Sequence, residues 1–144
     1  MLVEKKIQIL VIDDSATTRK ITRKLLNDLG YDSVEEAIDG ASGWNKIVGA
    51  ESPITLVICD WHMPNLSGLN LLKKIRAVDQ IKNLPFIMLT GENKKDEVMK
   101  AIQAGASAYL VKPLESTVLK NAIEKALSAK NDMISALKKG LKSG

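Results

Sequence analysis

The sequence predicts an α/β protein in which five strands and five helices alternate along the chain. Short apolar runs rich in β-branched residues recur five times, and a stretch with apolar residues at helical spacing follows each of them. Strands that alternate with helices pair in parallel through right-handed crossovers. We therefore expect a doubly wound parallel sheet with helices on both faces.

The predicted strands coincide with the five apolar runs. The third run is bounded by Pro53 and Pro64 and stays apolar until Asp60, which is typical of a strand buried on both faces of a parallel sheet. Glu35 and Glu36 interrupt the second run, which favours a position near a sheet edge. The strands are expected at residues 7–12, 34–38, 54–60, 84–89 and 107–111.

The predicted helices follow capping or turn residues. Ser15 can cap the first helix, which ends at Gly30, and Gly105 ends the fourth. The last helix starts near Glu115, and its apolar pattern continues as far as Leu141. The residues expected on the inner helix faces are Thr18, Ile21, Leu25, Leu29, Trp44, Ile47, Val48, Leu69, Leu72, Ile75, Val78, Val98, Ala101, Ile102, Val118, Ala122, Ile123 and Ala126.

Length and charge indicate one domain, over residues 1–127, followed at 128–144 by a basic helical extension or a tail. The last segment carries four lysines against one aspartate, so most of the net charge of +4 lies there and the body is almost neutral. A nucleic-acid-binding protein is expected to have a basic face in its body, so we predict no nucleic-acid partner. No apolar run reaches the length of a membrane span or a secretory signal, which predicts a cytoplasmic protein without membrane contact.

Polar residues end four of the five predicted strands: Asp13 and Asp14, Asp60, Thr90, and Lys112. These ends lie along the same edge of a parallel sheet, where such folds place their sites. Three crowded carboxylates repel one another unless a cation joins them, and hard oxygen ligands suit Mg²⁺, with Mn²⁺ as an alternative. One carboxylate then remains as a nucleophile, and the hydroxyl and ammonium groups can bind the oxygens of an incoming phosphoryl group.

This arrangement resembles the receiver domain of two-component response regulators, and the stand-alone, CheY-like members most closely. The matching motifs are Val-Ile-Asp-Asp-Ser (11–15), Cys-Asp-Trp-His-Met-Pro (59–64) with Ser-Gly-Leu (67–69), Leu-Thr-Gly (89–91) and Ala-Tyr-Leu-Val-Lys-Pro (108–113). The resemblance covers residues 5–127. It implies a flavodoxin-like sheet with strand order 2-1-3-4-5.

The resemblance also implies roles for single residues. Asp60 corresponds to the phosphoacceptor. The metal would be held by Asp13, Asp14, Asp60 and the backbone carbonyl of His62.

Three further positions match switch and contact residues of the family. Thr90 corresponds to the switch hydroxyl, and Tyr109 to the aromatic side chain that moves inward behind it. Lys112 corresponds to the lysine that contacts the phosphoryl oxygens, and the Lys112–Pro113 peptide bond to one that is cis in the family.

His62 departs from the family pattern, since related chemotaxis proteins commonly have asparagine at this position. We expect an exposed side chain with no role beyond its carbonyl. A sharper hypothesis is that His62, with Glu92, tunes how fast water reaches the acyl phosphate. Trp61, beside Asp60, is expected to be a partly exposed loop residue.

The predicted function is a signalling switch that catalyses only its own phosphorylation and dephosphorylation. The resemblance implies a histidine kinase as phosphodonor and a downstream protein as target, such as a flagellar motor switch component in chemotaxis signalling. Two alternatives keep the fold: a phosphorelay intermediate that passes the group to a second phosphotransfer protein, and the receiver part of a longer regulator.

Two other classes are disfavoured by residues that they require. A haloacid-dehalogenase-type phosphatase needs an aspartate two residues after its nucleophile, where this chain has His62. A dinucleotide-binding domain needs a glycine-rich turn after the first strand, and residues 13–17 contain no glycine.

Overall fold

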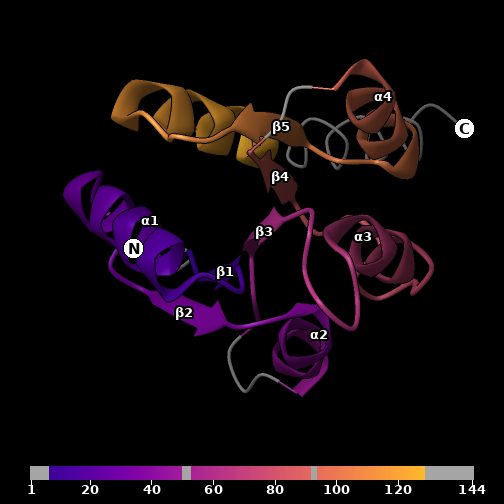
Figure 1. The fold of residues 1–144 in the computed structure, drawn as a ribbon. Helices are drawn as coiled ribbons and strands as arrows, with labels where there is room; N and C mark the ends of the chain where they lie inside the picture. The colour runs from indigo at the N-terminus through magenta and orange to yellow at the C-terminus, as the bar shows by residue number, and fades with distance from the viewer. Residues whose placement is uncertain (1–6, 50–52, 92–93, 129–144) are drawn as a thin grey trace, which may run out of the picture.

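A computed structural model describes residues 7–49, 53–91 and 94–128 of the chain. Its five strands form one parallel sheet in the order β2-β1-β3-β4-β5 (Figure 1). This arrangement and strand order confirm the predicted fold. The elements in chain order are β1 (Ile9–Ile12), α1 (Ala16–Asp28), β2 (Val34–Ala37), α2 (Gly40–Gly49), β3 (Leu56–Asp60), α3 (Gly68–Arg76), β4 (Phe86–Thr90), α4 (Lys95–Ala104) and β5 (Ala108–Val111). A fifth helix occupies residues 116–128.

Helices cover both faces of the sheet. In Figure 1, α1 and the helix at 116–128 lie on one side, and α2, α3 and α4 lie on the other. β1, β3 and β4 are inner strands, and every residue of these strands is buried. The second strand is an edge strand, as the two glutamates in it predict.

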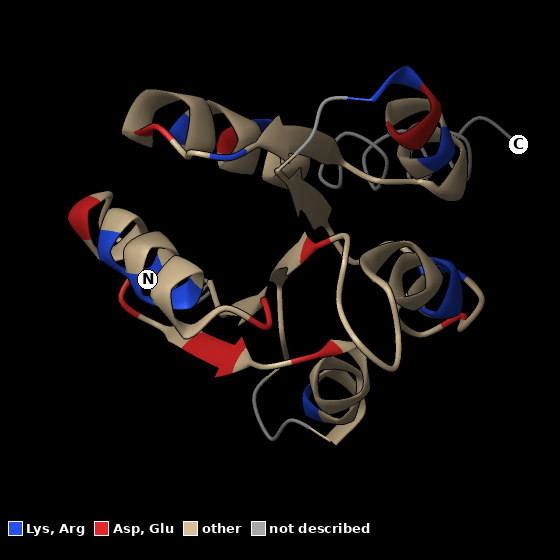
Figure 2. Ribbon diagram, viewed as in Figure 1, with Lys and Arg blue, Asp and Glu red and all other residues tan. Residues whose placement is uncertain are grey.

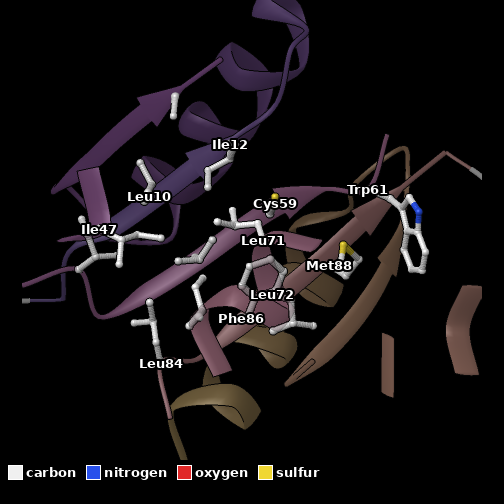
Figure 3. Packing of buried hydrophobic residues seen from close by; sticks show 14 of the residues in the cluster. Leu10, Ile12, Ile47, Cys59, Trp61, Leu71, Leu72, Leu84, Phe86 and Met88 are labelled. Atoms are coloured by element: carbon white, nitrogen blue, oxygen red, sulfur yellow. The ribbon is translucent and has the colours of Figure 1, made fainter. Parts of the chain in front are cut away.

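Alternate residues of each inner strand point to opposite faces and build two separate cores. Leu10 and Ile12 of β1 belong to the core under α2, α3 and α4, whereas Ile9 and Val11 belong to the core under α1 and the last helix. Figure 3 shows the first core, in which side chains of α3 and β4 pack together. Because both faces of the sheet are buried, the strands are held rigidly and their ends form a fixed platform.

Four helix residues that we expected in the core are exposed instead: Ile21, Val48, Ile102 and Val118. In each helix the adjacent position faces the sheet, and these buried residues are Thr22, Ile47, Ala101 and Leu119. Adjacent helix positions are about 100° apart, so a small rotation of the helix decides which of them is buried. Ile21 is 53% exposed, which becomes relevant to the site.

Residues 129–144 lie outside the described part of the chain, so the boundary at 127–128 and the basic extension or tail stay predictions. Within the described ranges, no helix is long and apolar enough to cross a membrane.

Candidate functional site

Three carboxylates meet at the carboxyl edge of the sheet. Asp13 and Asp14 follow β1, and Asp60 ends β3, which pairs directly with β1. One ligand oxygen from each lies within 4.8 Å of the others. Figure 2 shows the acidic segments after β1 and β3 at the edge where a basic segment follows β5. The parallel register therefore brings together residues that are nearly 50 positions apart in the sequence.

Lys112 enters this cluster from the end of β5. Its Nζ lies 3.1 Å from Asp13 Oδ2 and 3.5 Å from Asp60 Oδ2, so one ammonium group is shared by two carboxylates. The Lys112 backbone N–H donates to the Thr90 carbonyl at 2.7 Å, which ties the strand end to β4. The Lys112–Pro113 peptide bond is cis.

The loop after Asp60 is packed closely against the strand that it leaves. The Gly68 N–H donates to the Trp61 carbonyl at 2.9 Å, and a Cβ at position 68 would stand only 2.2 Å from the Asp60 carbonyl oxygen. The loop can therefore return to β3 only because residue 68 is glycine.

The same loop geometry corrects our expectation for Trp61. Its side chain is only 7% exposed and belongs to the core under α2, α3 and α4 (Figure 3). The chain turns back immediately after Asp60, and this turn directs the indole inward.

Asp60 is an aspartate whose charge is disfavoured by its surroundings. Burial raises the pKa of its carboxyl group above the ordinary value, and the nearby negative charge of Asp13 raises it further. The Lys112 ammonium opposes both effects but does not cancel them. The ionised cluster therefore gains from any additional positive charge that enters it.

The residues present fit a hard divalent cation. Asp13 is almost completely buried, and its Oδ2 accepts no well-aligned hydrogen bond from the described residues, although Lys112 lies close to it. A buried carboxylate oxygen left in this state suits a metal ligand. Three carboxylates and no thiolate ligand favour Mg²⁺ or Mn²⁺ over softer ions.

Thr90 and Tyr109 lie on the neighbouring strands. Thr90 is completely buried at the end of β4, one residue past Leu89, which pairs with Asp60. Tyr109 lies on β5 opposite Met88 and packs, partly buried, against the core under α4. The two residues thus lie on adjacent strands, with Thr90 at the carboxyl edge of the sheet and Tyr109 two residues farther from that edge.

The His62 side chain is exposed, as we expected, and it contacts a residue that the sequence did not indicate. Its imidazole is 64% exposed, and its Nε2 lies 3.3 Å from Oε1 of Glu97, whose side chain is only 15% exposed on α4. Glu92, the second residue in the hypothesis about the rate of hydrolysis, lies outside the described residues. The contact joins the loop after Asp60 to the first turn of α4.

Sequence reasoning missed two residues of this region, Glu97 and Arg19. Arg19 of α1 donates from Nη1 to the backbone carbonyl of Asp13 at 2.7 Å. The only signal in the sequence was the position of Arg19 in the helix that follows the aspartate pair. Asp39, two residues after β2, does not belong to the carboxylate cluster, and its Oδ1 accepts from the Ser42 N–H in α2.

Comparison with known protein families gives a match to the response regulator receiver domain over residues 9–124. The chain belongs to the response regulator receiver family. The matched range contains all three carboxylates, Thr90 and Lys112.

Individual relatives of this receiver include chemotaxis proteins. It is 38% identical over 124 residues to chemotaxis protein CheY-3 of Vibrio cholerae, covering 86% of this chain and 94% of that one. It is 43% identical over 120 residues to chemotaxis protein CheY1 of Helicobacter pylori, covering 83% of this chain and 96% of the other. The structure of Vibrio cholerae CheY4 matches with a TM-score of 0.77 at 31% identity, over 85% of this chain and all of that one.

Because its pKa is raised in the folded protein, ionised Asp60 opposes folding at neutral pH. We expect Asp60→Asn to raise the melting temperature of the metal-free protein at pH 7. A change of 1 kcal/mol would correspond to roughly 3 °C in a domain of this size. The gain should shrink as the pH falls from the raised pKa toward the ordinary aspartate value, and it should vanish below that value, where the wild-type carboxyl is neutral in both states. Calorimetry in EDTA measures this.

Asp79→Asn is the matched control, since its carboxylate is almost fully exposed. It should leave the melting temperature nearly unchanged across the same pH range. An Asp60→Asn variant no more stable than wild type at pH 7 would contradict this account of the site.

Proposed function

We propose that this receiver accepts a phosphoryl group on Asp60 from the phosphohistidine of a histidine kinase and then changes its affinity for a downstream protein. The observation that carries the proposal is the shared position of Lys112 Nζ between Asp13 and Asp60, at the edge where all three carboxylates meet. From this position the Lys112 ammonium group can leave one of the two carboxylates and bind the oxygens of an incoming phosphoryl group.

In the proposed reaction, an Asp60 carboxylate oxygen attacks phosphorus in line with the bond to the donor nitrogen. The new O–P bond forms as the N–P bond breaks, and the leaving imidazole retains the electron pair. The acidic pair with Asp60 would hold Mg²⁺, which when bound supplies positive charge against the repulsion between carboxylate and phosphoryl oxygens. Lys112 stabilises negative charge on those oxygens, and the Thr90 hydroxyl donates a hydrogen bond to one of them.

Phosphorylation would then act as a switch. Thr90 would turn toward the new phosphoryl group and Tyr109 would follow it inward, which shifts an existing equilibrium between two states. The named relatives are chemotaxis proteins, which supports a target in motility signalling, such as a flagellar motor switch component. We propose a cytoplasmic protein with its receiver at residues 1–127 and a basic extension or tail at 128–144.

The proposal is tested by the intact mass of the protein after incubation with Mg²⁺ and acetyl phosphate. We expect a gain of one phosphoryl group that is abolished by EDTA and by Asp60→Asn. If neither acetyl phosphate nor a phosphorylated histidine kinase produced any gain, the proposal would be contradicted. Reversible transfer to a second histidine protein would favour the phosphorelay alternative.

His62 offers a test of how water reaches the acyl phosphate. The contact with Glu97 ties the imidazole to α4. We propose that the ring, which is larger than an asparagine side chain, shields the acyl phosphate from water. We expect His62→Asn to release phosphate severalfold faster than wild type, measured as loss of the phosphorylated mass over time. Equal rates would exclude a role of the His62 side chain in hydrolysis, and only its backbone carbonyl would keep a proposed role.

The surface next to Lys112 suits a protein donor. A pocket of about 330 Å³ is bordered by α1 and the segment after β5, and its lining is mainly apolar. It includes Ile21, Leu89, Pro113 and Leu114 and reaches Lys112 itself. We propose that an apolar side chain of the donor, close to its phosphohistidine, occupies this pocket during transfer.

Ile21→Glu tests this docking. Loss of a central apolar contact and burial of a charge should slow transfer from a histidine kinase by about tenfold, since such contacts contribute more than about 1 kcal/mol. Phosphorylation by acetyl phosphate should be unchanged, because a small donor needs no docking surface. Val48→Glu is the matched control, equally exposed but on α2 across the sheet. Equal effects of the two substitutions on kinase transfer would exclude the pocket as the docking site.

A further inference from the structure

A network of two arginines and one glutamate lies beside the carboxylate cluster, toward the β2 edge of the sheet. Arg19 Nε donates to Glu36 Oε1 at 3.1 Å, and Arg23 Nε donates to Glu36 Oε2 at 2.8 Å. Arg23 also donates from Nη2 to the Val34 carbonyl. The network therefore joins α1 to the edge strand β2.

Only one of the two arginines reaches the site. Arg19 Nη1 donates to the Asp13 carbonyl at 2.7 Å, and the Arg19 side chain is only 15% exposed. Arg23 is more exposed and has no contact with Asp13 among its hydrogen bonds. Glu36 orients the Arg19 guanidinium by accepting from its Nε while Nη1 holds the carbonyl.

Asp13 is held by two further hydrogen bonds besides the contact with Arg19. The Asp13 backbone N–H donates to the Ala37 carbonyl at 3.1 Å, and Asp13 Oδ1 accepts from the Ser15 N–H at 2.9 Å. With the carbonyl also held, the whole residue is oriented and only Oδ2 remains without a well-aligned hydrogen bond. Partners of this kind, one step removed from a metal, orient its ligands and alter its affinity.

We propose that Arg19 is a positioning residue for the acidic pair: by holding the Asp13 carbonyl it sets the affinity of the Asp13–Asp14–Asp60 cluster for a divalent cation. This inference rests on the metal site in the proposed function. It is distinct from a purely electrostatic role, because a cationic side chain near a cation site lowers its affinity by repulsion. If only the charge of Arg19 mattered, its removal would tighten Mg²⁺ binding. If its contact with the Asp13 carbonyl positions the site, its removal would weaken Mg²⁺ binding.

The experiment is isothermal titration of Mg²⁺ into wild type, Arg19→Gln and Arg23→Gln. Both substitutions remove one positive charge and one ion pair with Glu36, but only the first removes the contact with Asp13. We expect Arg19→Gln to raise the dissociation constant on the order of tenfold. Arg23→Gln should leave it unchanged or slightly lower.

Arg19→Lys keeps the positive charge and serves as a second variant if Arg19→Gln fails to fold. A single ammonium group cannot reproduce the two-direction contact of the guanidinium, so Mg²⁺ binding should again weaken. If wild type binds Mg²⁺ and both Arg19 variants have an unchanged or lower dissociation constant, the role of Arg19 is overturned but the metal site is not. No Mg²⁺ binding by wild type would overturn the metal site as well.

Discussion

Repulsion among three carboxylates at one edge of a parallel sheet is the constraint on which the site depends. The register between β1 and β3 places Asp13 and Asp14 beside Asp60, and burial together with the nearby charge of Asp13 makes the negative charge of Asp60 costly. A single ammonium group, that of Lys112, lies between two of them. The cluster remains short of positive charge, and a divalent metal ion is complementary to that state.

The scaffold makes this arrangement possible by keeping the strand ends fixed. Both faces of the sheet are covered, so β1, β3 and β4 cannot move apart to relieve the repulsion. The loops that follow β3 and β1 are also fixed. Gly68 packs against the Asp60 carbonyl, and Arg19 donates to the Asp13 carbonyl. In contrast, the His62–Glu97 contact joins a loop to α4 through an exposed side chain. The scaffold therefore fixes the carboxylates more firmly than it fixes the exposed His62 side chain.

Most of the fold could be predicted because its signals are local. Each strand is a run of apolar residues, and each run ends at a polar residue that the parallel sheet brings to the same edge. The helix faces were predicted less well. Ile21 and Thr22 are adjacent in α1, and the apolar residue was expected inside, yet the threonine is buried. Its hydroxyl donates to the Thr18 carbonyl, which satisfies the polar group within the helix and permits burial.

The sequence by itself determined the alternation of strands and helices, the strand ends at Asp13, Asp60, Thr90 and Lys112, and the family motifs that they carry. Only the tertiary structure decided that Trp61 turns inward, that His62 meets Glu97 and that Arg19 holds Asp13. Strand ends follow from composition over a few residues, which a sequence displays directly. Contacts of long side chains join elements distant along the chain and depend on how helices sit on the sheet, so no local pattern encodes them.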